Sequence, residues 1–218
     1  SRGSKDRTAL ILYPRLSEVE LLKSICEEFG LPKQAISRIE TVSGLLEVLN
    51  AFLLHNAREA REAVLVIDEA QKLYDETLET IRLLNNLETE NSKLLQIILV
   101  GQTELEKRVM SVSMRQLAQR ISVMAKVSPL GFDEVEKYVH HRLTTASESH
   151  LVRFDQKAIK FIYSESRGIP RLINRYCEMA LLAAELNQVR LIDAKLVKDA
   201  LSATQPKRIK HLFAGGNV

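Results

Sequence analysis

The stretch Ala63-Val64-Leu65-Val66-Ile67-Asp68-Glu69-Ala70-Gln71 decides the fold class. Its first five residues are apolar without interruption, and a run of this length predicts a strand. A strand without alternating polar residues is typical of a parallel sheet whose two faces are both covered by helices. The stretch therefore predicts a buried parallel strand that ends in two carboxylates.

Further strands are expected on both sides of this one along the chain. Three more apolar runs of strand length occur, at residues 8–13, 95–100 and 121–127. Helical patterns separate the runs, and the first of these helices is predicted to begin with a capping box made by Ser17 and Glu20. An alternation of strands and helices indicates an α/β fold with an open parallel sheet.

The pattern changes after residues 128–130. From there to residue 201 only helices are expected, two of them capped by Asp155 and Asp193 and one with Pro170 in its first turn. We therefore expect four parts. Residues 1–7 include a cloning remnant and have no fold of their own, and residues 8–128 form an α/β core. Residues 129–203 form a small all-α domain, and residues 204–218 form a flexible basic tail.

The composition excludes several classes of protein. Of the 218 residues 45% are hydrophobic and 27% are charged, with a net charge of +3, which argues against disorder and against a strongly basic nucleic-acid binder. Aromatic residues are few and Trp is absent, so a base-stacking surface is not expected. Cys26 and Cys177 lie in apolar helical patterns and favour free thiols in a reducing compartment. No apolar run approaches the length of a membrane span.

Polar residues follow the predicted strands at the edge where open α/β sheets bind ligands. Asp68 and Glu69 follow one strand and Gln102 follows the next. One carboxylate at such an edge can hold Mg²⁺, usually through water, and a second can polarise an attacking water molecule. This arrangement suits phosphoryl transfer, which depends on positioning and charge compensation. The alternative is that Asp68 caps the following turn and Glu69 is only solvated.

Five segments together resemble the AAA+ ATPases of the general secretion pathway protein A, or ExeA, type. They are LVIDEAQKL, ETIRLLNNLET, LLQIILVGQTEL, RQLAQRI and GIPRLINR, at residues 65–73, 79–89, 94–105, 115–121 and 168–175. The resemblance extends from about Thr8 to Leu201, and the same core recurs in exopolysaccharide-locus and transposition ATPases. It implies a P-loop NTPase-like parallel sheet flanked by helices and followed by a helical lid domain.

The resemblance also implies roles at the strand ends. It makes Asp68 the Walker B carboxylate at the Mg²⁺ site and Glu69 the catalytic base. Gln102 matches the sensor 1 position, where the family reads the γ-phosphate of ATP. The alternative for Gln102 is a glutamine that only caps its loop.

The same resemblance makes three arginines candidate site residues. Arg115 and Arg120 lie where AAA+ proteins keep an arginine finger, which stabilises transition-state charge in a neighbouring subunit. Arg171 matches sensor 2, in the first turn of a lid helix, from which it could reach the phosphates. We expect Arg120 to be catalytic and Arg115 and Arg171 to contact the nucleotide. The alternative for Arg115 and Arg120 is a surface salt bridge.

The glycine-rich loop that holds phosphates in this family, G-x-x-x-x-G-K-[ST], does not occur in the 218 residues. We therefore expect the chain to be truncated or altered, and to begin after the family's first strand, P-loop and helix. The family places that strand between the one ending at Gln102 and residues 121–127. Its loss would leave unpaired sheet edges, which direct pairing of these two strands, a strand from a neighbouring chain or residues outside this sequence would fill. We expect direct pairing or chain exchange, and weak ATP binding.

Three functions are compatible with the sequence. The leading hypothesis is a cytoplasmic AAA+ ATPase module that forms homo-oligomers, uses ATP and Mg²⁺, and drives assembly of a secretion or envelope complex with a secretion-complex partner. For an ExeA-like parent it would work at the cytoplasmic face of the inner membrane. The second hypothesis is a DNA-associated regulator of the transposition type, supported by the basic residues 207–211. The third is a non-catalytic interaction module, in which Glu69→Gln would change nothing.

Overall fold

The computed structural model describes residues 6–89, 92–146 and 152–204. The chain divides into two compact units between Met124 and Ala125, and each unit has its own hydrophobic core. The units are described one at a time below.

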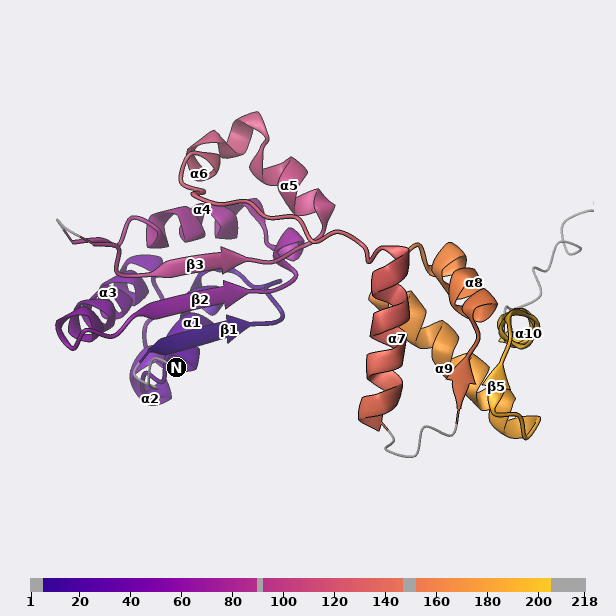
Figure 1. Ribbon diagram of the computed structural model, residues 1–218. Coiled ribbons are helices and arrows are strands. Elements are labelled where there is room, and N and C mark those ends of the chain that lie inside the picture. Colours follow the sequence, from indigo (N-terminus) through magenta and orange to yellow (C-terminus); the bar gives the residue numbers. More distant parts are fainter. Residues whose placement is uncertain (1–5, 90–91, 147–151, 205–218) are drawn as a thin grey trace, which may run out of the picture. The chain divides into compact units, whose positions relative to one another are not determined.

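A three-stranded parallel sheet forms the centre of the first unit (Figure 1). Its strands lie in the order β1 (Arg7–Ile11), β2 (Ala63–Ile67) and β3 (Gln96–Leu99). The register pairs Ile11 with Ile67 and Ile67 with Leu99, so the strands end side by side. The segments that follow the three strands therefore meet at one edge of the sheet.

Some of the helices of the first unit pack on one face of this sheet (Figure 1). In chain order the helices are α1 (Glu18–Glu28), α2 (Lys33–Ser37), α3 (Val42–Arg58), α4 (Asp75–Leu84), α5 (Thr103–Val109) and α6 (Arg115–Ala118). One 3₁₀ turn, η1 (Ala70–Lys72), lies between β2 and α4. A second, η2 (Val112–Met114), lies between α5 and α6. The expected capping box opens α1, since the Ser17 N–H donates to a Glu20 carboxylate oxygen at 2.8 Å and the Glu20 N–H donates to Ser17 Oγ at 3.4 Å.

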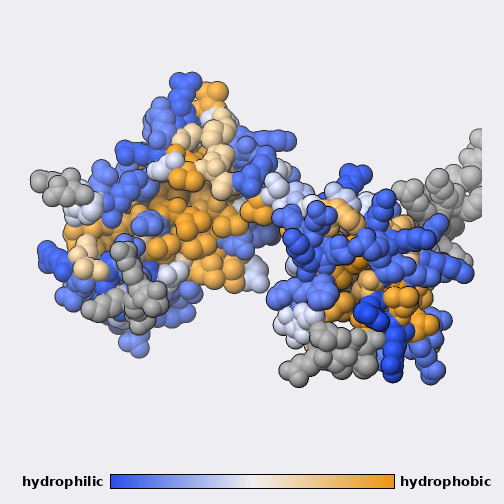
Figure 2. All heavy atoms as spheres, viewed as in Figure 1, coloured by the Kyte–Doolittle hydropathy of each residue, from blue (hydrophilic) through white to orange (hydrophobic). Residues whose placement is uncertain are grey.

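The expectation that both faces of the sheet are covered is wrong. Ile11, Leu65 and Ile67 point into the core, whereas the opposite face exposes Leu10 by 44% and Ile98 by 48%. Figure 2 shows this uncovered apolar face over the strands. The error has a physical reason. The apolar run shows that both faces of the strand carry apolar side chains, but α1, α3 and α4 all pack on the same face and leave the other one exposed.

The strand expected at residues 121–127 does not form. These residues have no regular structure, and Val123 and Val127 are exposed by 82% and 97%. Direct pairing of this segment with β3 is therefore also wrong, since β3 pairs with β2 alone among the described residues. An apolar run becomes a strand only where a neighbouring strand satisfies its backbone groups, and the described part of the chain places none beside it.

The second unit consists mainly of helices, as the sequence predicts. They are α7 (Phe132–Ala146), α8 (Gln156–Ser166), α9 (Pro170–Leu186) and α10 (Ala194–Thr204). The unit also contains an unexpected pair of short parallel strands, β4 (Arg153–Phe154) and β5 (Leu191–Ile192). Each strand leads directly into a helix, through the predicted caps Asp155 and Asp193. The two extended segments that precede these caps are the ones that pair with each other.

A buried glycine ties the start of the second unit to the start of α9. The Leu130 N–H donates to the Gly168 carbonyl oxygen at 2.9 Å. Gly168 has a φ of +76°, and a Cβ built there would lie 2.0 Å from the Leu130 carbonyl oxygen. Only glycine therefore fits at this position, two residues before Pro170 begins α9.

Candidate functional site

The turn after β2 presents the two carboxylates that the sequence singles out. The Asp68 N–H donates to the Ile11 carbonyl oxygen at 2.9 Å, so this turn continues the pairing between β1 and β2. Asp68 Oδ1 accepts the Glu69 N–H at 2.7 Å, and Glu69 adopts the left-handed backbone conformation with a φ of 53°. Asp68 thus supports the turn through one carboxylate oxygen, as the alternative reading expects, while both side chains remain half-buried at the sheet edge.

The Glu69 carboxylate has two partners within its own turn. Lys72 Nζ lies 2.8 Å from Glu69 Oε2, and Gln71 Nε2 donates to the same oxygen at 3.0 Å. The hydrogen bond and the charge of Lys72 lower the pKa of the Glu69 carboxyl below its ordinary value, and the Gln71 hydrogen bond adds to this effect. Glu69 is therefore ionised at neutral pH, which is the state that a general base requires.

The turn after β3 meets the turn after β2 at the same edge. The Val100 N–H donates to the Ile67 carbonyl oxygen and the Ala70 N–H donates to the Val100 carbonyl oxygen, both at 2.9 Å. Gln102 follows and forms the N-cap of α5, and its own N–H donates to Gln71 Oε1 at 3.2 Å. The structure thus brings Asp68, Glu69 and Gln102 to one edge of the sheet, as parallel topology leads one to expect.

An arginine from α5 holds the turn after β2 from the other side. Arg108 Nη1 donates to the carbonyl oxygens of Gln71 and Leu73, at 2.8 Å each, and Arg108 Nη2 contacts the Asp75 carboxylate. Sequence reasoning did not find Arg108 or give Gln71 a role. The motif contains Gln71 as its fourth residue after the strand, but the partners that define its role are distant in sequence.

The three arginines that the sequence singles out are all exposed. Arg115 begins α6 and lines a surface depression together with Glu79 of α4, and that depression contains none of Asp68, Glu69 or Gln102. Arg120 is exposed just after α6. Arg171 belongs to the second unit, where it lies exposed in the first turn of α9.

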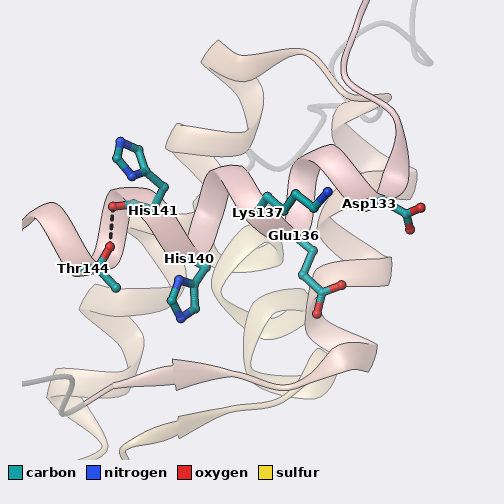
Figure 3. Close-up of a pocket in the computed structure, with 6 residues that line it drawn as sticks. All are labelled: Asp133, Glu136, Lys137, His140, His141 and Thr144. Atoms are coloured by element: carbon teal, nitrogen blue, oxygen red, sulfur yellow. Dashed lines mark hydrogen bonds between the residues drawn. The ribbon is translucent and has the colours of Figure 1, made fainter.

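A second surface depression lies along α7 of the second unit (Figure 3). Its lining includes His140, His141 and Glu136, which all project from one helix. No group of three or more His, Cys, Asp or Glu side chains in the described ranges has the arrangement of a metal site, and this depression is no exception. It carries none of the residues that the sequence predicts for nucleotide chemistry.

The donors at the sheet edge suit Mg²⁺ rather than a transition metal. Mg²⁺ in proteins is usually held by one or two carboxylates, with water and substrate phosphates completing its octahedron. Asp68 supplies one such carboxylate, and it lies at the edge of the sheet where the two turns meet. The residues present therefore fit this ion, with Asp68 as the group that would hold it.

Within residues 6–89, 92–146 and 152–204, no helix combines the length and the hydrophobicity that a bilayer crossing needs.

Comparison with known proteins gives consistent matches. The sequence profile of a family described as an AAA domain matches residues 3–109. General secretion pathway protein A of Aeromonas hydrophila is 42% identical to this chain over 176 residues, which are 81% of the chain and 31% of that protein. The chain thus spans about a third of the length of this curated relative. The resemblance stated from the sequence motifs is confirmed.

Solved structures support the fold. The Aeropyrum pernix ORC2 protein, in its ADPNP-ADP complexes, matches with a TM-score of 0.65 and 17% identity, over 96% of this chain and 55% of that one. The Thermotoga maritima RuvB Holliday junction branch migration motor matches with a TM-score of 0.52 and 15% identity, over 91% and 61%. At these identities the likeness shows the fold alone, and it confirms the predicted α/β fold with a parallel sheet followed by a small helical domain.

Proposed function

The chain matches the AAA domain over residues 3–109 and is similar to general secretion pathway protein A, and from this premise we propose that it is the ATPase module of a protein that drives assembly of a secretion or envelope complex. The observation that carries the proposal is the meeting of Asp68, Glu69 and Gln102 at the carboxyl edge of a parallel sheet. Their side-chain types suit a metal ligand, a base and a phosphate contact on one nucleotide.

Each residue at the edge has a proposed task. Asp68 would hold Mg²⁺, which supplies charge compensation at the phosphates. The ionised Glu69 would accept a proton from the attacking water molecule. The Gln102 side chain is exposed at the end of β3, where its amide could orient the water or a phosphate oxygen.

The arginines extend the proposal to an assembly of several copies. Arg115 and Arg120 are exposed on the first unit, as a residue must be to reach a neighbouring subunit, and Arg171 is exposed on the second. We assign Arg120 the role of the arginine finger in trans, and Arg115 and Arg171 contacts to the nucleotide. A homo-oligomer is the state in which these roles are possible.

A cytoplasmic location accompanies the proposed function. Both cysteines are free thiols, which agrees with a reducing compartment. The partner we propose is a protein of the secretion complex, in keeping with the name of the curated relative. The basic residues 207–211, on which the DNA-binding alternative depends, lie outside the described residues.

The decisive experiment compares Glu69→Gln with Glu47→Gln, an exposed glutamate on α3 remote from the edge. In the natural protein, Glu69→Gln should retain ATP and lose hydrolysis by about a hundred-fold or more, because the base is lost while the metal site remains. Glu47→Gln should behave as the parent does. Equal hydrolysis in all three proteins would contradict the role of Glu69 as the base, whereas no hydrolysis in any of them would contradict the ATPase function and favour an interaction module.

ATP binding by the 218 residues alone is a separate test. Because no G-x-x-x-x-G-K-[ST] loop occurs among them, we propose that they bind ATP weakly. Calorimetric titration with and without Mg²⁺ measures this directly, and tight Mg²⁺-dependent binding would show that other groups hold the phosphates. Retention on DNA that falls steeply with salt would instead support the DNA-associated alternative.

A further inference from the structure

Gln71 connects the two turns that meet at the sheet edge. Its side chain is half-buried in η1, and both atoms of its amide have partners. Nε2 donates to the Glu69 carboxylate at 3.0 Å, and Oε1 accepts the main-chain N–H of Gln102 at 3.2 Å. The main-chain carbonyl of Gln71 is in turn held by Arg108 at 2.8 Å.

The chemistry of the two partners explains why an amide stands here. A carboxylate needs a donor and a main-chain N–H needs an acceptor, and the amide of Gln carries both on one planar group without charge. The opposite orientation of the amide would set oxygen against oxygen and N–H against N–H. The network therefore fixes which end of the Gln71 side chain faces Glu69.

A glycine in the turn after β3 makes room for this bridge. A Cβ built on Gly101 would lie 2.9 Å from Gln71 Oε1 and 2.9 Å from Leu105 Cδ2. Any side chain at Gly101 would therefore press on the bridging amide. The close approach of the two turns depends on both residues together.

The other partner of Glu69 is less suited to fixing its position. Lys72 is exposed by 56% at its side chain, and an ion pair between exposed groups contributes about 0–1 kcal/mol. Gln71, held at its main chain by Arg108 and at its amide by two turns, is the more rigid partner.

We infer that Gln71 is a positioning residue that holds the Glu69 carboxylate in register with the Gln102 turn, a role that rests on the proposed ATPase function. It contacts no reacting atom. If the Gln102 turn moves on contact with the phosphates, Gln71 moves with it and shifts the Glu69 carboxylate, which would act as the base.

Two variants separate the two halves of the bridge. Gln71→Met removes donor and acceptor at similar length, whereas Gln71→Glu keeps an acceptor for the Gln102 N–H and loses the donor to Glu69. Gln34→Met, at an exposed glutamine of α2, is the matched control. Unfolding temperatures are measured first, and all four proteins should unfold within a few degrees of one another, because Gln71 lies outside the core.

Amide hydrogen exchange tests the bridge without nucleotide. At Gln102 it should be about ten-fold faster in Gln71→Met than in the parent, and close to the parent rate in Gln71→Glu and Gln34→Met, because only the first loses the acceptor. Unchanged exchange in Gln71→Met would overturn the inference.

Steady-state ATP hydrolysis tests the positioning role in the natural protein. Both Gln71 variants should lower kcat about ten-fold or more while KM for ATP stays within about two-fold, because the loss is in placing the base and not in binding. A parent-like kcat in Gln71→Met would refute the inference even if exchange rises. A parent protein without ATP hydrolysis would refute the proposed function and the catalytic part of this role, whereas the exchange rates would still report on the bridge.

Discussion

Replacing Gly168 by alanine should strongly destabilise the second unit. The left-handed backbone at this position, with a φ of +76°, costs an L-residue about 1 kcal/mol. The added Cβ would also lie 2.0 Å from the Leu130 carbonyl oxygen and 2.9 Å from the Leu130 nitrogen, so one chain must move by more than an ångström. That movement breaks the hydrogen bond from the Leu130 N–H to Gly168, which contributes about another 1 kcal/mol.

Together with repacking around the start of α9, these effects should lower the free energy of unfolding of the second unit by about 3–5 kcal/mol. A unit of this size has a free energy of unfolding of roughly 4–12 kcal/mol, so the loss is a large part of the total. The unfolding temperature of the second unit should fall by about 15–30 °C, measured by differential scanning calorimetry. Arg171 lies in the turn that this change displaces.

Two other glycines separate the contributions. Gly30 has a φ of +85° and nothing within 4 Å of its built Cβ, so Gly30→Ala should lose only the conformational part, about 1 kcal/mol, in the first unit. Gly131 has an ordinary φ, and its built Cβ would lie no closer than 3.5 Å to Glu134, so Gly131→Ala should change stability by less than about 0.5 kcal/mol. If Gly168→Ala loses no more than Gly30→Ala, the tight contact with Leu130 is wrong.

Three further predictions concern stability and surface. Ser17→Ala removes the cap of α1 and should lower the free energy of unfolding by about 1 kcal/mol in a urea titration, and an unchanged midpoint would refute the cap. Burial raises the pKa of Cys26 to about 11 and of Cys177 to about 12, so both thiols should react slowly with a disulfide reagent at pH 8 until urea unfolds the chain. Because these pKa values are raised in the folded state, their contribution to stability is full below about pH 8.5 and is lost as pH rises toward 11, which urea titrations at several pH values can follow. The uncovered sheet face should bind the dye ANS, and Ile98→Lys should weaken that fluorescence without lowering the unfolding temperature, whereas an unchanged signal would place the dye elsewhere.

Local features of the fold followed from the sequence. Ser17, Asp155 and Asp193 cap the helices expected of them, and Pro170 begins α9, because each of these interactions spans three or four residues. The caps depend on neighbours that the sequence itself displays. The three strands of the first sheet overlap the predicted apolar runs, and each of them has a parallel neighbour that pairs with it.

Features that depend on distant partners did not follow. Residues 121–127 have the composition of a strand but no partner among the described residues, and the apolar pattern of β2 could not tell which face of the sheet would be covered. The candidate site shows the same division. Parallel topology placed Asp68 and Glu69 near Gln102, whereas the bridge through Gln71 joins residues 31 positions apart.

Residues other than glycine adopt the left-handed backbone conformation in two kinds of position in the described residues: at the ends of helices, which is common, and at Glu69, which is unusual. Among the described residues, Ala60, Arg167 and Gln188 adopt it at or just after the ends of α3, α8 and α9, where helices commonly terminate in this way. Glu69 adopts it between a strand and a 3₁₀ turn. Glycine would relieve this strain by about 1 kcal/mol, so the turn gives up folding free energy in order to display an acid there, and a polypeptide selected for stability alone would not keep it.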